Sequence, residues 1–214
     1  MPPGKSPKFT IPELERQARR LLADRFPDGV AIPVDIDFLV ESEPGVTLDT
    51  LGGLRSQFGI AGVTLAHPAE KRFTVIIDHR VADGLPAFSR FTVAEEFAHL
   101  TLHRSLLVGV KTVEDAVRLH ESPAYYRDYE RNAKWFASAI LMPEDLLRED
   151  ARTIFAGLRV TVRDEGVLRN RLTIRLAQRF NVSESAMRYR LQRWPLKTYD
   201  AIRQAFERGL AALP

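Results

Sequence analysis

The sequence contains no cysteine. Disulfide bonds, thiolate metal sites and cysteine nucleophiles are therefore excluded. The chain also has no run of about 18 apolar residues, so no segment shows the pattern of a transmembrane helix. Its first residues, MPPGKSPKFTIPE, lack the apolar stretch that a secretory signal requires. We therefore expect a cytoplasmic protein with no membrane partner.

An excess of positive charge is nearly absent from the chain as a whole, but not from its last third. The formal net charge is +3 over 214 residues. Residues 1–143 carry 17 basic and 19 acidic side chains, whereas residues 144–214 carry 14 basic and 9 acidic ones. A phosphate-binding surface is therefore expected only in the C-terminal part, where a solvated helix face is the alternative.

Helical and strand periodicities predict an α+β fold in two parts. A helix over 11–25 and a short helix after Pro33 precede strand patterns at 46–48, 60–65 and 73–77. Only helical patterns follow, over 90–106, 124–141, 144–158, 167–180, 183–193 and 199–210. Met142-Pro143 is the expected boundary. We predict an α+β domain over residues 1–143 and a basic helical domain over residues 144–214.

One predicted helix carries a stripe of ionisable side chains, within the segment FTVAEEFAHLTLH, residues 91–103. On a helical wheel, Glu95, Glu96, His99 and His103 lie within about 100° of one another. The rest of the circumference is mostly apolar, which predicts a buried helix. Buried carboxylates and imidazoles must pair, share protons or bind a cation. A metal site and a plain Glu–His ion pair both fit this helix.

A second segment, YERNAKWFASAILMP, carries one carboxylate on an otherwise apolar stripe. Glu130 lies on the same side as Ala133 and Ala137, whose small side chains would let another helix approach closely. We predict that Glu130 points at the stripe of the first helix, with an exposed helix end as the alternative. His67, His79 and His120 fall in turn or loop contexts and are expected at the surface.

Together the two segments resemble the ImmA/IrrE family of metallopeptidases. The zincin helix of that family usually reads like FTLAHELGHLLLH, and its second signature is a glutamate followed by Ala-Asn-x-Phe-Ala and a Leu-Met-Pro ending. Here Lys134 stands where the family usually has asparagine. The resemblance covers about residues 10–195 and implies a small zincin-like domain followed by a helix-turn-helix-like segment.

The resemblance also implies the chemistry of a gluzincin. By position, His99 is the second histidine ligand, Glu130 is the glutamate ligand, and Glu96 is the general base that takes a proton from metal-bound water. The implied cofactor is one divalent metal, with zinc expected first and manganese or iron(II) as alternatives. The implied partner is a protein substrate, a helix-turn-helix repressor of the kind that controls stress responses.

Glu95 stands where the family has its first histidine, so the motif reads EExxH in place of HExxH. Three outcomes are open. Glu95 itself completes the metal site, or His103, one turn beyond His99, supplies the second nitrogen. In the third outcome no metal binds tightly, and the acids and histidines share protons.

The basic tail contains a predicted helix, turn and helix within LTIRLAQRFNVSESAMRYRLQRW, residues 172–194. Outward positions of the second helix include Arg188, Tyr189 and Arg193, which are residue types that contact phosphates and base edges. A purely structural helical cap is the alternative, and DNA is not the favoured partner.

Two functions remain. The first is a metal-dependent endopeptidase that cleaves a protein substrate such as a repressor. The second is a catalytically degenerate zincin-fold protein that holds no metal and acts as a protein- or DNA-binding regulator. Glu95 is the residue that separates them.

Overall fold

The computed structural model describes residues 8–121 and 123–213, without the side chains of residues 123–126. The chain divides into two compact units. The sheet unit contains the residues up to Ala31 and Asp35–Leu141, and the helical unit contains Ile32–Val34 and the residues from Met142 onward. Among the described residues, no helix is both long enough and apolar enough to cross a membrane.

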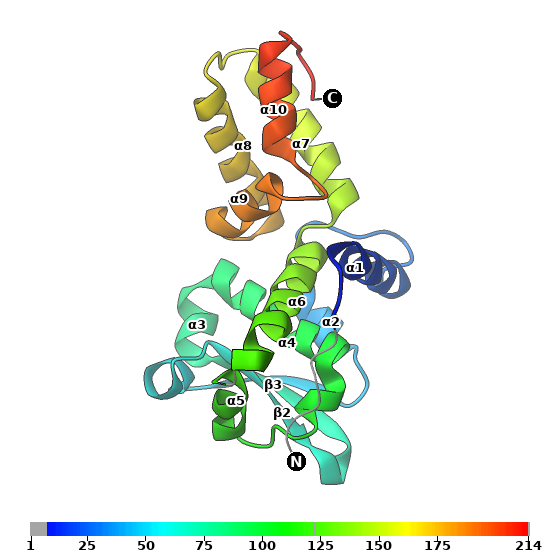
Figure 1. Cartoon of the computed structure of the whole chain (residues 1–214), viewed down its shortest axis with the longest axis vertical. Coiled ribbons are helices and arrows are strands. Elements are labelled where there is room, and N and C mark those ends of the chain that lie inside the picture. The colour runs from blue at the N-terminus through cyan, green and yellow to red at the C-terminus, as the bar shows by residue number, and fades with distance from the viewer. Residues whose placement is uncertain (1–7, 122, 214) are drawn as a thin grey trace. The chain divides into compact units, whose positions relative to one another are not determined.

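The sheet unit contains three strands and six α-helices among its described residues (Figure 1). In chain order, its elements are α1 (Ile11–Arg25), α2 (Ile36–Glu41), β1 (Val46–Leu51), η1 (Leu54–Phe58), β2 (Gly62–His67), η2 (Pro68–Glu70), β3 (Arg72–Asp78), α3 (His79–Gly84), α4 (Pro86–Leu107), α5 (Val113–His120) and α6 (Pro123–Leu141). The predicted α+β fold with three short strands is confirmed.

The three strands form a mixed sheet in the order β1-β3-β2. Strand β1 runs parallel to β3, and β2 runs antiparallel to it, with Thr64 opposite Val75. In β3 the side chains of Phe73, Val75 and Ile77 are buried, as expected when alternate residues face a packed layer. Strand β2 lies at one edge of the sheet, because it comes last in the strand order. Helices α4 and α5 both pack against it.

Helices α4 and α6 form the centre of the sheet unit. They pack against each other, and α4 also contacts β2 and β3. Phe97, Leu100, Phe136 and Ile140 are almost completely buried. The apolar circumference of α4 explains this burial, because a helix of this kind is stable only inside a protein.

Gly62 allows β2 to lie unusually close to α4. A Cβ atom at this position would lie 2.6 Å from Cγ2 of Thr92 and 3.2 Å from Cγ of Glu96. The absence of a side chain here therefore sets how near the strand comes to the stripe on α4.

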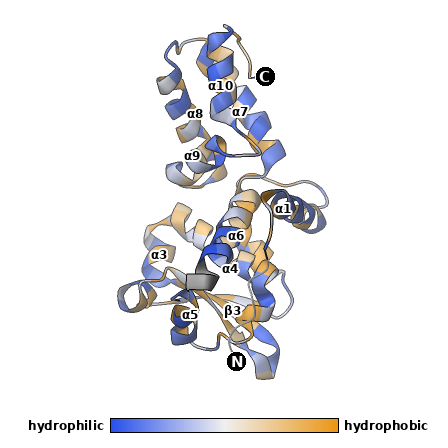
Figure 2. Cartoon of the chain, in the orientation of Figure 1, coloured by the Kyte–Doolittle hydropathy of each residue, from blue (hydrophilic) through white to orange (hydrophobic). Residues whose placement is uncertain are grey.

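The helical unit contains α7 (Glu144–Arg159), α8 (Glu165–Phe180), α9 (Glu184–Gln192) and α10 (Thr198–Glu207). Phe155, Phe180 and Met187 are fully buried in its core. Ser183 caps α9 by accepting a hydrogen bond from the backbone N–H of Ala186, at 3.2 Å. Hydrophilic and hydrophobic residues alternate along its helices, as expected for amphipathic packing (Figure 2).

Candidate metal-binding site

Helices α4 and α6 bring together the charged residues of the two sequence motifs. The Nε2 atom of His99 lies 3.5 Å from Oε1 of Glu130, and the two side chains are only 5% and 13% exposed. Glu130 therefore points at the stripe on α4 and is not an exposed helix end.

The separation of these two atoms suits two ligands of one metal ion. Two donors on a tetrahedral zinc ion lie about 3.3–3.5 Å apart, because each bond is about 2.0–2.2 Å long. Oε1 of Glu130 is buried and forms no hydrogen bond. Among the side chains that the structure describes, no three carboxylates and imidazoles already form a group that could hold a metal ion. Two donors are thus suitably spaced for one metal ion.

His103 and Tyr129 hold the imidazole of His99 in position. Nδ1 of His99 and Nδ1 of His103 are 3.1 Å apart, and the ring of Tyr129 stacks on that of His99 with centroids 3.9 Å apart. Burial, together with the nearby charge of His99, lowers the pKa of His103 to about 3, so His103 stays neutral at pH 7. It can then accept the Nδ1–H of a His99 whose Nε2 is free to bind a metal.

These contacts give His103 a positioning role. Its Nδ1 is used toward His99, and its Nε2 is buried without a hydrogen-bond partner. In the tautomer in which its Nδ1 accepts from His99, Nε2 of His103 carries the proton and has no lone pair for a metal. The alternative in which His103 binds the metal stays a prediction.

Glu96 lies beside the same cluster and is held by the edge strand. Its Oε2 accepts a hydrogen bond from Oγ1 of Thr64 on β2, at 2.8 Å. The pKa of Glu96 is raised to about 8, chiefly by burial; the bond from Thr64 lowers it, and the charges of Glu130 and Glu95 contribute to the rise. A cation nearby would favour the ionised form that a general base needs.

A small cavity adjoins these side chains. Its volume is about 10 Å³, and Glu96, His99, His120 and Tyr129 are among the residues that line it. This is room for about one water molecule. A water molecule in this cavity would lie beside the carboxylate of Glu96 and the imidazole of His99.

Glu95 is close enough to Glu130 for their charges to interact. Burial raises the pKa of Glu95 to about 7; the positive charge of Lys134 opposes this shift, and the negative charge of Glu130 adds to it. Oε1 of Glu95 is buried without a hydrogen-bond partner. Glu95 is thus a candidate third ligand, because its buried Oε1 has no hydrogen-bond partner that a metal would have to replace.

His120 belongs to this cluster, although its sequence context predicted a surface position. Its Nε2 lies 3.9 Å from Oε1 of Glu130, and its side chain is 34% exposed. The predicted loop context is wrong, because residues 113–120 form α5, which packs against β2 and α6 and leaves the side chain of His120 half-buried. The capping box of Thr112 and Asp115 is the sequence signal for this short helix.

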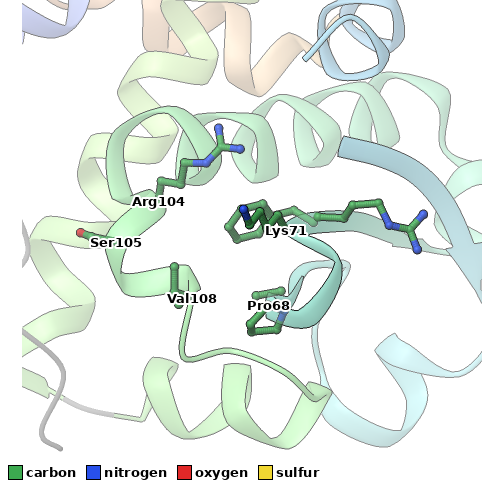
Figure 3. A pocket seen from close by; sticks show the side chains of 8 residues that line it. Pro68, Lys71, Arg104, Ser105 and Val108 are labelled. Carbon is green, nitrogen blue, oxygen red and sulfur yellow. The ribbon is translucent and has the colours of Figure 1, made fainter. Parts of the chain in front are cut away.

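A larger hollow lies elsewhere in the sheet unit, between the turn that joins β2 to β3 and the end of α4 (Figure 3). Its volume is about 570 Å³, and the guanidinium of Arg104 lies over the ring of Phe73 beside it, 5.0 Å from the centroid. The described residues that line it include no carboxylate or imidazole. It therefore provides no ligands for a metal.

The residues predicted to contact DNA lie at α9 in the helical unit. Tyr189 is 46% exposed, and the guanidinium of Arg193 lies 3.8 Å from the centroid of its ring. Arg188 donates a hydrogen bond to Oδ1 of Asn170, at 3.2 Å. These contacts engage both guanidinium groups within the protein, and binding of DNA by them stays a prediction.

Comparisons with known proteins identify the family of this chain. The family described as IrrE N-terminal-like domain, a peptidase family, matches residues 86–192, which is half of the chain and includes His99 and Glu130. No curated protein matches. Among solved structures, the chain is similar to one described as a Mycobacterium tuberculosis transcriptional regulator, with a TM-score of 0.53 and 17% sequence identity.

That similarity covers 86% of this chain and 48% of the other, so the chain spans about half the length of the regulator. At this identity the likeness concerns the fold. The family match extends from the start of α4 to the end of α9 and contains both sequence motifs. The chain therefore belongs to the IrrE N-terminal-like family, a metallopeptidase-related family whose members are generally metal-dependent.

Proposed function

We propose that the sheet unit is a metal-dependent endopeptidase domain that hydrolyses a peptide bond in a protein substrate. The observation that carries this proposal is the 3.5 Å separation of Nε2 of His99 and Oε1 of Glu130, beside a one-water cavity that Glu96 also lines. A metal site, a base and room for a water are the parts that hydrolysis of this class requires.

His99 and Glu130 would hold the metal, and Glu95 is the third ligand that the sequence predicts. Zinc is the first choice, and manganese or iron(II) suit a carboxylate-rich set better than a histidine-rich one. The bound ion would supply positive charge that makes a water more acidic. With Glu95 as a ligand, two carboxylates neutralise a divalent ion, and this acidifying effect is smaller than with neutral ligands.

Glu96 would act as the general base. Thr64 fixes its Oε2 by a 2.8 Å hydrogen bond, so the carboxylate is held where it lines the one-water cavity. From there it takes a proton from the attacking water and returns it to the leaving amine. Tyr129 and His103 keep the ring of His99 in place during these proton transfers.

A peptide is much larger than this cavity, so a substrate has to move part of its wall. Residues of β2, α4, α5 and α6 line the cavity. Helix α5 is the shortest of these helices, and its side chains are mostly exposed or half-buried. We infer that α5 shifts when a substrate binds.

The substrate that we propose is a transcriptional repressor of the helix-turn-helix class. Proteins of the IrrE/ImmA type act on regulators, which supports a substrate of this kind. Cleavage at one bond of such a repressor would release the genes that it controls.

The first experiment measures bound metal after the purified protein is supplied with zinc, manganese or iron(II). We expect about one tightly bound ion per chain, and its loss in His99→Ala and Glu130→Ala. His79→Ala is the matched control, because His79 pairs with Asp83 on α3 and its side chain is 61% exposed. Full occupancy in His99→Ala would contradict the proposal.

The second experiment tests catalysis with candidate repressors, whose fragments are identified by mass spectrometry. Glu96→Gln should keep the metal and lower the cleavage rate by about 10²–10⁴-fold, as expected for loss of a general base. Cleavage by Glu96→Gln at the wild-type rate would remove Glu96 from the mechanism.

A degenerate, non-catalytic protein is the second candidate function, and one observation favours it. Nζ of Lys134 lies 3.4 Å from Oε2 of Glu130, so a positive charge of the protein already neutralises part of the acidic cluster. Such a protein would bind a polypeptide without cleaving it. The absence of metal from wild-type protein supplied with all three ions would favour this candidate.

A further inference from the structure

The third protein ligand is the open part of the proposed metal site, and His120 is a candidate for it beside Glu95. This inference rests on the proposed function. Oε1 of Glu130 faces two imidazole nitrogens, Nε2 of His99 at 3.5 Å and Nε2 of His120 at 3.9 Å. Two ligands of one zinc ion lie about 3.3–3.5 Å apart. The distance from Nε2 of His120 to Oε1 of Glu130 exceeds this spacing by about half an ångström, so His120 has to move toward Glu130 to share an ion with it.

The partial exposure of the side chain makes this small movement feasible. His120 is the last residue of α5, and its side chain is 34% exposed. Rotation about its side-chain bonds can move the ring by this distance without unpacking a core residue. His120 and His99 also line the same small cavity.

The chemistry of the donor set also favours His120. Two histidines and one glutamate form the ligand set of thermolysin-type zinc sites. With Glu95 in place of His120, the ion would have two anionic ligands, and Glu96 would place a third carboxylate beside them. Lys134 is also available to the acidic pair, because its charge acts on both Glu95 and Glu130.

We propose that, in the substrate-free protein, His120 supplies the third protein ligand of the metal, together with His99 and Glu130 and in place of Glu95. Helix α5 then both closes the site and completes it. Displacement of α5 by a substrate would withdraw His120 from the residues that hold the ion and make room for the substrate there.

The test measures metal affinity in the full-length protein, without any assay of activity. Metal-free protein is titrated with Zn²⁺ by calorimetry and with Co²⁺ by visible absorption, which reports the ligand set. We expect His120→Ala and His120→Gln to weaken binding by at least about tenfold, a loss in line with the disruption of a metal site, and to change the Co²⁺ spectrum. Glu95→Gln should change affinity by less than about threefold.

Three further variants make the result decisive. His79→Ala is the matched histidine control and should bind as wild type does. Wild-type affinity in both His120 variants, or a loss in Glu95→Gln as large as theirs, overturns the assignment of His120. If wild-type protein and His99→Ala or Glu130→Ala bind equally weakly, the proposed metal-dependent function itself fails, and this inference fails with it.

Discussion

Lys134 and Glu130 lie one helical turn apart on α6, and Nζ of Lys134 is 3.4 Å from Oε2 of Glu130. The other oxygen of the same carboxylate faces Nε2 of His99. One carboxylate thus lies between a lysine ammonium and a candidate metal ligand. The side chain of Lys134 is 54% exposed, so solvent screens part of its charge.

Lys134→Asn should increase the affinity for a divalent metal by about tenfold, or about 1.4 kcal/mol. The reason is that the ammonium competes with the ion for Glu130 and repels it. Calorimetric titration of the metal-free protein with Zn²⁺ measures the change.

Lys71→Asn is the matched control for this substitution. It removes the same charge at the turn between β2 and β3, where the backbone is left-handed (φ 52°) and tolerates asparagine. An equal gain in affinity in both variants would show that the effect reflects net charge alone.

Glu95→His should strengthen zinc binding and favour zinc over manganese. The substitution removes one of three neighbouring carboxylates and adds a nitrogen donor at a position where a buried oxygen lacks a hydrogen bond. Competition titrations with Zn²⁺ and Mn²⁺ measure both effects. If the variant binds zinc no better than wild type, residues beyond the first motif limit the site.

Glu96→Gln should remove part of the pH dependence of stability in the metal-free protein. Burial raises the pKa of Glu96 from 4.5 to about 8, so between these values the folded protein holds a proton that the unfolded chain has released. Wild-type stability therefore falls as pH rises from 4.5 to 8. The neutral amide of glutamine does not ionise, so the variant does not lose this part of its stability as pH rises.

Urea unfolding at pH 4.5 and pH 8.5 tests this prediction. The variant should gain about 2–4 kcal/mol relative to wild type between the two pH values. A residual fall with pH is expected, since Glu95 shares the raised pKa and the direction of the effect. A constant difference between the two proteins would show that folding does not raise the pKa of Glu96.

Gly62→Ala should destabilise the protein by about 1–3 kcal/mol. The added methyl group would lie 2.6 Å from Cγ2 of Thr92 and 3.2 Å from Cγ of Glu96, so β2 and α4 must move apart. Thermal or urea unfolding measures the loss.

Gly84→Ala is the control for this prediction, because no atom lies within 4 Å of the position of its Cβ. It should be neutral or slightly stabilising, since alanine favours a helix. A similar loss in both variants would mean that the close contact at Gly62 is not its cause.

The sequence predicted the parts of the fold that depend on local periodicity. The apolar pattern of residues 90–106 indicates a helix, and the observed helix α4 begins earlier, at Pro86. The pattern did not reveal that start because a proline in the first turn follows a short helix that ends at Gly84. Helix α5 was missed because eight residues are too few for a clear period.

The sequence by itself determined that Glu95, Glu96 and His99 share one side of a helix, because the repeat of the α-helix requires it. Only the tertiary structure decided which residues of other elements lie next to them. The bond from Thr64 to Glu96 joins residues 32 positions apart, and His120 reaches Glu130 only because α5 packs against α6. Such contacts follow from the burial of apolar faces on separate elements, and no local pattern encodes which polar groups that burial brings together.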